Sequence, residues 1–297
     1  MKIKVKGIVC AMVTPMDKAQ NIDLDATGKL VERLIANGIG GLFILGTNGE
    51  FHVLTKDEKL RFAKAVVKMA AGRVPVFAGT GGNSTREVIE LSQEMEKTGV
   101  DALAVITPFL VPISQQELAA HYKRVAASVH LPIFLYNIPK NTGVPISPEV
   151  AAELADVDNI CGIKDSSGDI HNIEAYIAAG RGKDFVVLSG SDSLILKALK
   201  LGAVGAVAST SNLLTQIDVG IYESFQAGRM EEAQEKQESI NELRRVSKLA
   251  TIPSVIKRAV TLSGIDVGDA RLPVLPVTDE IDRQVRDMLQ YYHIEAR

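Results

Sequence analysis

Strand-like and helix-like segments alternate eight times along this chain, and this alternation narrows the possible folds more than any other feature. The strand-like segments are short runs rich in apolar and β-branched residues, separated by amphipathic stretches of roughly ten to seventeen residues. The predicted strands cover residues 8–13, 41–45, 75–78, 102–106, 132–135, 160–163, 185–188 and 205–208. Eight such pairs in roughly 210 residues predict an α/β fold, a parallel sheet closed into a (β/α)8 TIM barrel, with a doubly wound open sheet as the alternative.

The helix boundaries carry signals of their own. Thr55, Ser84 and Ser114 are each followed three residues later by glutamate, which matches the capping box at a helix start. After about residue 226 the strand-like runs cease, and helical stretches are predicted at 230–249, 253–262 and 278–291. We therefore expect a (β/α)8 barrel over residues 1–226 that carries the catalytic residues, and a C-terminal helical extension over residues 227–297.

The composition argues against several classes of protein. With 46% apolar and 23% charged residues and a formal net charge of −3, the chain has no basic field that would attract nucleic acid or an acidic membrane surface. No apolar run approaches the roughly 20 residues that span a bilayer, and the first residues show no signal-peptide pattern. Cys10 and Cys161 lie in separate apolar runs, so we expect buried, reduced thiols and a cytoplasmic protein.

Lys164 differs from most lysines of the chain because it ends the apolar run 160–163 instead of lying among charged neighbours. In a (β/α)8 barrel the reactive groups lie at the C-terminal ends of the strands, which is where this lysine falls. Burial disfavours an ammonium, so a lysine at the mouth of an apolar barrel loses its proton more readily and can attack a carbonyl. From the local sequence alone, the alternative is a strand-end lysine paired with Asp165.

Polar and glycine-rich segments also follow other predicted strands, and together they predict one polar pocket at this end of the barrel. These segments are 46–50, 136–137, 164–167, 189–192 and 209–212. The turn Thr47-Asn48-Gly49 offers consecutive backbone amides, which suit a small carboxylate. The alternative is an ordinary turn in which Gly49 supplies a positive φ.

Four strings occur in order at the ends of predicted strands: 46–50 (GTNGE), 136–139 (YNIP), 162–169 (GIKDSSGD) and 190–192 (GSD). Over nearly the whole chain, this ordered set resembles the dihydrodipicolinate synthase and N-acetylneuraminate lyase superfamily, the DapA-like class I pyruvate-dependent aldolases. The resemblance implies a TIM barrel that acts on pyruvate or another 2-oxo acid. It also implies a homotetramer built as a dimer of dimers.

The resemblance assigns roles to individual residues. Lys164 is implied to form a Schiff base with the keto group, Tyr136 to relay protons, and Thr47 to orient the tyrosine hydroxyl. The amides of Thr47 and Asn48 are implied to bind the substrate carboxylate, with a main-chain contact from Val207 nearby. The iminium is the electron sink for the C–C bond, so no metal and no other cofactor is expected. The five histidines are scattered along the chain, which also argues against a metal aldolase.

Three positions depart from the patterns of well-known members of the superfamily. Dihydrodipicolinate synthases have an arginine that grips the second substrate's carboxylate where this chain has Asn141, and a tyrosine pair where it has Phe109-Leu110. Sialic acid lyases have an acidic pair after the seventh strand, of which this chain keeps Asp192 and replaces the partner with Ser193. Both activities therefore become in-family alternatives.

The remaining pocket is rich in hydroxyl and amide groups and poor in positive charge, which suits a 2-keto-3-deoxy sugar acid. Its predicted members are Asn48, Asn141, Ser166, Ser167, Asp192 and Ser209, and Gly190 is a further predicted substrate-binding residue. The strings at 46–51 and 164–169 look most like 2-keto-3-deoxygluconate and 4-hydroxy-2-oxoglutarate aldolases. The leading interpretation is retro-aldol cleavage of such an acid to pyruvate and an aldehyde. The alternative from another class is a barrel that binds a 2-oxo acid without chemistry.

Overall fold

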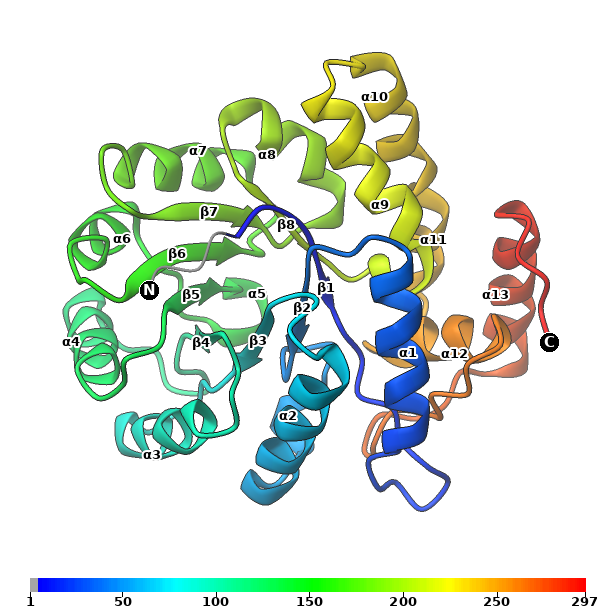
Figure 1. The fold of residues 1–297 in the computed structure, drawn as a ribbon, viewed down its shortest axis with the longest axis horizontal. Helices are drawn as coiled ribbons and strands as arrows, with labels where there is room; N and C mark the ends of the chain where they lie inside the picture. Colours follow the sequence, from blue (N-terminus) through cyan, green and yellow to red (C-terminus); the bar gives the residue numbers. More distant parts are fainter. Residues whose placement is uncertain (1–4) are drawn as a thin grey trace.

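The structure is a computed structural model that describes residues 5–297; residues 1–4, part of the segment expected to hold no signal peptide, lie outside it. Eight parallel strands follow one another around a closed barrel (Figure 1). They are β1 (Gly7–Ala11), β2 (Gly41–Ile44), β3 (Val76–Gly79), β4 (Ala102–Ile106), β5 (Ile133–Asn137), β6 (Ile160–Asp165), β7 (Val186–Ser189) and β8 (Gly205–Ala208). Because β1 pairs with β8, the predicted TIM barrel is confirmed and the open sheet is wrong.

Strands β5 and β6 extend two residues beyond their predicted ends. Tyr136 pairs in register with Lys164, and Asn137 with Asp165, so polar residues continue the ladder after the apolar run has ended. Two residues of the predicted site therefore lie on hydrogen-bonded strands rather than on loops. A strand holds a side chain more precisely than a loop does.

Helices surround the barrel, and most begin where a capping residue predicts it. Thr55 and Ser114 form complete capping boxes, whereas Ser84 accepts the Glu87 amide without a reciprocal bond. The helices up to residue 226 are α1 (Leu24–Ala36), α2 (Lys56–Ala70), α3 (Thr85–Glu96), α4 (Gln115–Ala126), α5 (Pro139–Thr142), α6 (Pro148–Leu154), α7 (Ile170–Ala179), α8 (Ile195–Leu201) and α9 (Ser211–Gln226). Two short 3-10 helices also occur in this part of the chain: η1 (Phe51–Val53) follows β2, and η2 (Asp192–Leu194) follows β7.

The C-terminal helices gather on one side of the barrel, with α10 packed along α9 (Figure 1). They are α10 (Met230–Ser239), α11 (Asn241–Ser247), α12 (Ser254–Leu262) and α13 (Asp279–Tyr291). The prediction of one helix over 230–249 is wrong, because the helix is interrupted at Ile240. The Tyr292 hydroxyl lies at this break, where it donates to the Ser239 carbonyl (2.6 Å) and accepts from the Leu243 amide (3.0 Å). A side chain that enters the backbone ladder in this way interrupts a helix.

Both cysteines are buried, and they form no disulfide in the described chain. Among residues 5–297, no helix combines the length and the apolar character needed to cross a membrane.

Candidate active site

Lys164 lies at the C-terminal end of β6 with its side chain inside the barrel mouth, where it is only 5% exposed. Its Nζ lies 4.1 Å from the centre of the Tyr136 ring and 4.6 Å from that of the Phe43 ring. Within residues 5–297 the amine has no hydrogen-bond or ion-pair partner. Asp165 is engaged elsewhere, by the Asn137 amide (2.7 Å) and the Ser167 hydroxyl (2.6 Å). The alternative of a structural pair between Lys164 and Asp165 is therefore wrong.

A second buried lysine shows what a structural role looks like in this protein. Lys257 on α12 is fully buried, and its Nζ donates to Glu50 (2.9 Å), to the Thr14 carbonyl (3.0 Å) and to the Asp269 carbonyl (2.6 Å). All three ammonium protons thus have acceptors, as a buried charge requires. Sequence reasoning missed this residue, although a lysine among the apolar residues of SVIKRAVTL was a visible signal.

Tyr136, the predicted proton relay, lies beside Lys164 on β5. Its hydroxyl is 3.1 Å from the Thr47 hydroxyl, and its ring meets Phe43 edge to face at a centroid distance of 5.9 Å. Thr47 lies in the turn after β2, so the C-terminal ends of β2, β5 and β6 bring hydroxyl, phenol and amine together. Phe43, which sequence reasoning did not single out, supplies the aromatic surface under the amine.

The turn after β2 presents backbone amides toward the mouth of the barrel. The amides of Thr47 and Asn48 donate to no acceptor in the described residues, while the Glu50 amide closes the turn onto the Thr47 carbonyl (3.2 Å). Unpaired consecutive amides are the feature that binds a carboxylate. The alternative explanation of Gly49 is wrong, because the positive φ falls on Glu50 (57°) instead. Gly49 is required by space, since a Cβ there would lie 2.8 Å from the Leu45 amide nitrogen.

Glu50 attaches this turn to the C-terminal part of the chain. One carboxylate oxygen accepts from Lys257 (2.9 Å), and the other accepts from the backbone amide of Arg271 (2.7 Å). Burial lowers the pKa of Lys257, and the Glu50 charge opposes that effect. Residues 257–271 thereby brace the turn that carries Thr47 and Asn48.

On the other side of Lys164, Gly190 follows β7 and packs directly against the lysine. A Cβ at Gly190 would lie 2.1 Å from the Ser166 hydroxyl and 2.9 Å from the Lys164 Cε. Ser166 donates to the Gly190 carbonyl at 3.2 Å. Glycine is therefore needed at 190 to leave the lysine its place. Val207 lies on β8, in register with Val9, and its implied main-chain contact stays a prediction.

Asp192 and Ser209 meet at the ends of β7 and β8. The Asp192 carboxylate accepts the amides of Ser209 (3.0 Å) and Thr210 (3.2 Å). Burial raises the pKa of Asp192 above its usual value. The hydrogen bonds from these two amides and the charges of Arg244 and Lys164 oppose this rise but are the smaller effects.

Four of the predicted polar residues line two cavities. Asn48, Asp192 and Ser209 line a cavity of about 180 Å³ that reaches α11 and α12. Asn141 is exposed on α5 and lines another cavity of about 270 Å³ with Thr47 and residues that include Phe51, Ile106 and Phe109. Thr47 and Asn48, neighbours in the turn after β2, line different cavities, and the expectation of one continuous polar pocket stays a prediction.

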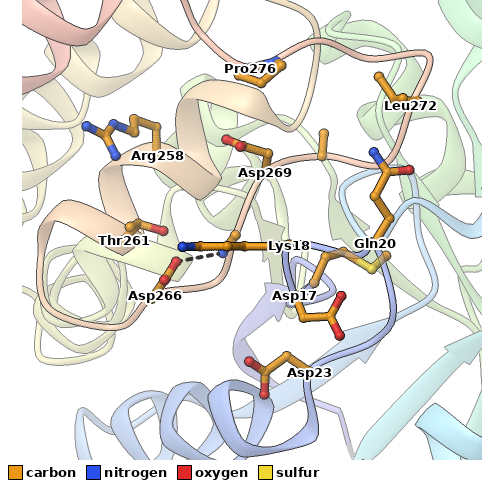
Figure 2. A pocket seen from close by; sticks show the side chains of 13 residues that line it. Asp17, Lys18, Gln20, Asp23, Arg258, Thr261, Asp266, Asp269, Leu272 and Pro276 are labelled. Carbon is orange, nitrogen blue, oxygen red and sulfur yellow. Dashed lines mark hydrogen bonds between the residues drawn. The ribbon is translucent and has the colours of Figure 1, made fainter.

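A larger cavity, of about 470 Å³, lies outside the barrel mouth and contains none of the predicted site residues. Figure 2 shows Asp17, Lys18 and Asp23 of the β1–α1 loop facing Asp266 and Asp269 across it. Among the described residues, no three His, Cys, Asp or Glu side chains are placed to hold a metal ion.

Comparison with known proteins gives consistent matches along the full chain. The model of the dihydrodipicolinate synthetase family matches residues 4–292. The 4-hydroxy-tetrahydrodipicolinate synthase 1 of Halalkalibacterium halodurans is 41% identical over 283 residues, which are 95% of this chain and 96% of that protein. The crystal structure of a dihydrodipicolinate synthase from Bacillus anthracis has a TM-score of 0.94 at 37% identity, over 97% of this chain and 99% of that one. A prophage protein of the dihydrodipicolinic acid synthase family from E. coli K12, solved with pyruvate, has a TM-score of 0.93 at 32% identity, over 97% and 99%.

Proposed function

Because this chain belongs to the dihydrodipicolinate synthetase family, within the DapA-like class I pyruvate-dependent aldolases, we propose that it works through a Schiff base between pyruvate and Lys164. The chain is an enzyme of this carbon–carbon lyase family, so the alternative of a barrel without chemistry is set aside. The observation that carries the proposal is the buried Lys164 amine, which has no partner in the described residues and lies next to the Tyr136 and Thr47 hydroxyls.

The proposed reaction uses each of these groups. The neutral Lys164 amine attacks the keto carbon of pyruvate, water leaves, and an iminium forms. Loss of a proton from the methyl carbon gives an enamine, which adds to the carbon of an aldehyde; the aldehyde oxygen takes a proton relayed by Tyr136. Water then releases the product and regenerates the amine. The faces of the Phe43 and Tyr136 rings support the iminium, because aromatic faces attract cations.

We infer that the carboxylate of pyruvate binds the amides of Thr47 and Asn48. These amides lack other acceptors, and the bracing of the turn by Glu50 keeps them oriented before substrate arrives. A prepositioned pair of donors costs little reorganisation during the reaction.

For the second substrate, the names of the relatives favour dihydrodipicolinate synthase activity, which the sequence analysis gave as an alternative. They do not favour its leading interpretation, cleavage of a 2-keto-3-deoxy acid. The Halalkalibacterium relative is named a 4-hydroxy-tetrahydrodipicolinate synthase. That product is a nitrogen ring with two carboxylates, so once pyruvate has supplied three carbons, the partner is a four-carbon amino acid aldehyde, aspartate semialdehyde. We propose condensation of pyruvate with this aldehyde. Cleavage of a 2-keto-3-deoxy acid is the second candidate, favoured by Asn141 at the position where an arginine would hold the carboxylate of the aldehyde.

Intact-protein mass after incubation with pyruvate and borohydride tests the Schiff base. The native chain is expected to gain one reduced pyruvate and the Lys164→Ala variant none. The Tyr136→Phe variant is expected to be labelled like the native chain while its turnover falls about 100-fold or more, because it lacks the relay. Labelling of Lys164→Ala, or unchanged turnover in Tyr136→Phe, would contradict these assignments.

The direction and substrate are tested by following pyruvate. We expect pyruvate consumption with aspartate semialdehyde and no pyruvate release from 2-keto-3-deoxygluconate, N-acetylneuraminate or 4-hydroxy-2-oxoglutarate. Release from one of these acids, without consumption by the semialdehyde, would reverse the order of the two candidates.

A further inference from the structure

Arg244 on α11 is half-buried and has most of its hydrogen-bonding capacity unused. Its one bond in the described chain runs from Nη1 to the Asn241 side chain (3.1 Å), and no described carboxylate lies within ion-pair distance. The next residue, Arg245, is different, since it makes two bonds to Glu242 (2.9 and 2.7 Å) and one to Gln284 (3.2 Å). A guanidinium has five N–H donors, so Arg244 leaves a fork of donors available.

This guanidinium faces a cavity that also contains predicted site residues. Arg244 and Lys248 line the cavity of about 180 Å³ together with Asn48, Asp192 and Ser209, and the rest of its wall includes the apolar Ile252 and Ile256. Asn48 is one of the two residues whose amides are proposed to hold the pyruvate carboxylate. The cavity therefore shares Asn48 with the proposed pyruvate site and has two cations in its wall.

The acidic group in this cavity, Asp192, interacts with the charge of Arg244 only at a distance. Both oxygens of the Asp192 carboxylate accept backbone amides, and in the described chain Asp192 forms no ion pair with the arginine. Two cations thus face one carboxylate that already has hydrogen-bond partners. The expectation that the pocket is poor in positive charge does not hold for this cavity, because α11 contributes Arg244 and Lys248 from the C-terminal part of the chain.

Resting on the proposed function, we propose that Arg244, assisted by Lys248, binds an anionic group at the far end of the aldehyde substrate. The ligand class is a short aldehyde that ends in a carboxylate or a phosphate, since a guanidinium fork binds either anion through paired hydrogen bonds. Asn141, at the position where the resemblance expects an arginine, lines the other cavity. The proposed anion contact therefore lies in a different cavity from Asn141.

The test is steady-state kinetics of condensation with pyruvate, using aspartate semialdehyde, glyceraldehyde 3-phosphate and uncharged glyceraldehyde. In the Arg244→Gln variant, KM for the anionic aldehyde that the native enzyme prefers is expected to rise at least tenfold, while KM for glyceraldehyde stays unchanged. The preferred anionic aldehyde identifies the anion as carboxylate or phosphate. Arg245→Gln is the matched control, because its guanidinium is already paired outside the cavity, and it is expected to leave all three KM values unchanged.

Borohydride labelling with pyruvate separates this inference from the proposed function. Arg244→Gln is expected to be labelled as fully as the native chain, because pyruvate binds on the Lys164 side. A KM that rises equally for all three aldehydes, or for none, would overturn the anion subsite, as would a native enzyme that uses glyceraldehyde as well as the anionic aldehydes. Absence of labelling in the native chain would instead overturn the proposed function itself.

Discussion

Asp218 is a buried carboxyl on α9 that lies behind the proposed site. Its Oδ2 accepts the hydroxyls of Thr210 and Ser211, both at 2.7 Å, and its Oδ1 has no partner in the described chain. Burial, with the nearby Asp192 charge adding to it, raises the pKa of Asp218 to about 7. This carboxyl therefore exchanges its proton near neutral pH, although the proposed reaction does not use it.

The raised pKa predicts how stability depends on pH. Between the unfolded value near 3.9 and the folded value near 7, the folded state holds one more proton at Asp218 than the unfolded state. The contribution of this extra proton to the free energy of unfolding is complete below the unfolded pKa. As pH rises toward the folded pKa, that contribution decreases by up to about 1.4 kcal/mol per pH unit. Urea unfolding from pH 5 to 8 should show a smaller decline in Asp218→Asn than in the native chain. Asp25→Asn, at an exposed position, should keep the native slope, and equal slopes in all three proteins would contradict the prediction.

Single residues differ in how far the sequence reveals them. Lys164, Tyr136 and Thr47 could be found because each follows an apolar run, and the ends of the strands converge in a barrel. Arg244 could not be found in this way, since nothing in a solvated helix tells which of two adjacent arginines turns toward the barrel. Asp218 could not be found from the sequence either, because its burial depends on how α9 packs.

Among the structural elements, the turn after β2 depends on partners that are distant in the chain. Glu50 lies on this turn, and Lys257 on α12 supplies the charge that its buried carboxylate needs. Local patterns predicted the strand and its turn but not this brace. The same holds for the break at Ile240, which depends on the hydroxyl of Tyr292, 53 residues after Ser239.

Breaking the buried pair should weaken both the fold and the site. Lys257→Met leaves the Glu50 carboxylate buried without its cation and is expected to lower the free energy of unfolding by about 3–5 kcal/mol. The double variant Glu50→Gln/Lys257→Met removes the stranded charge and should recover part of that loss. Urea unfolding measures the stability, and borohydride labelling with pyruvate reports on the turn. A double variant no more stable than Lys257→Met alone would show that charge is not the cause.

At the scale of the whole molecule, an apolar tip at residues 110–111 is exposed next to Phe109, which lines a cavity with Thr47. Leu110 is 85% exposed and has a positive φ of 81°, which is unusual for a residue other than glycine, and Val111 next to it is also exposed. Exposed apolar side chains in an unfavourable backbone conformation are typical of a contact surface. We propose that this tip packs against another copy of the chain in the homotetramer that the sequence resemblance implies.

A charge at the tip tests this assembly. The native chain is expected to run as a tetramer and Leu110→Glu as smaller species, because a carboxylate in the contact would be buried without a partner. Light scattering coupled to size exclusion measures the mass directly. Leu275→Glu is the control at another exposed leucine and should leave the mass of the assembly unchanged. A tetramer that survives Leu110→Glu would place the contact elsewhere.

The contacts that brace Glu50 also bear on folding during synthesis. Lys257 follows Glu50 by 207 positions, and the Arg271 amide follows it by 221. A ribosome therefore synthesises all eight strands, which include Lys164 and Tyr136, before it adds the residues that brace the proposed pyruvate-binding turn. A nascent chain that stalls after β8 has all eight strand segments but lacks the residues that brace the turn. We therefore expect full activity only once residue 271 has emerged.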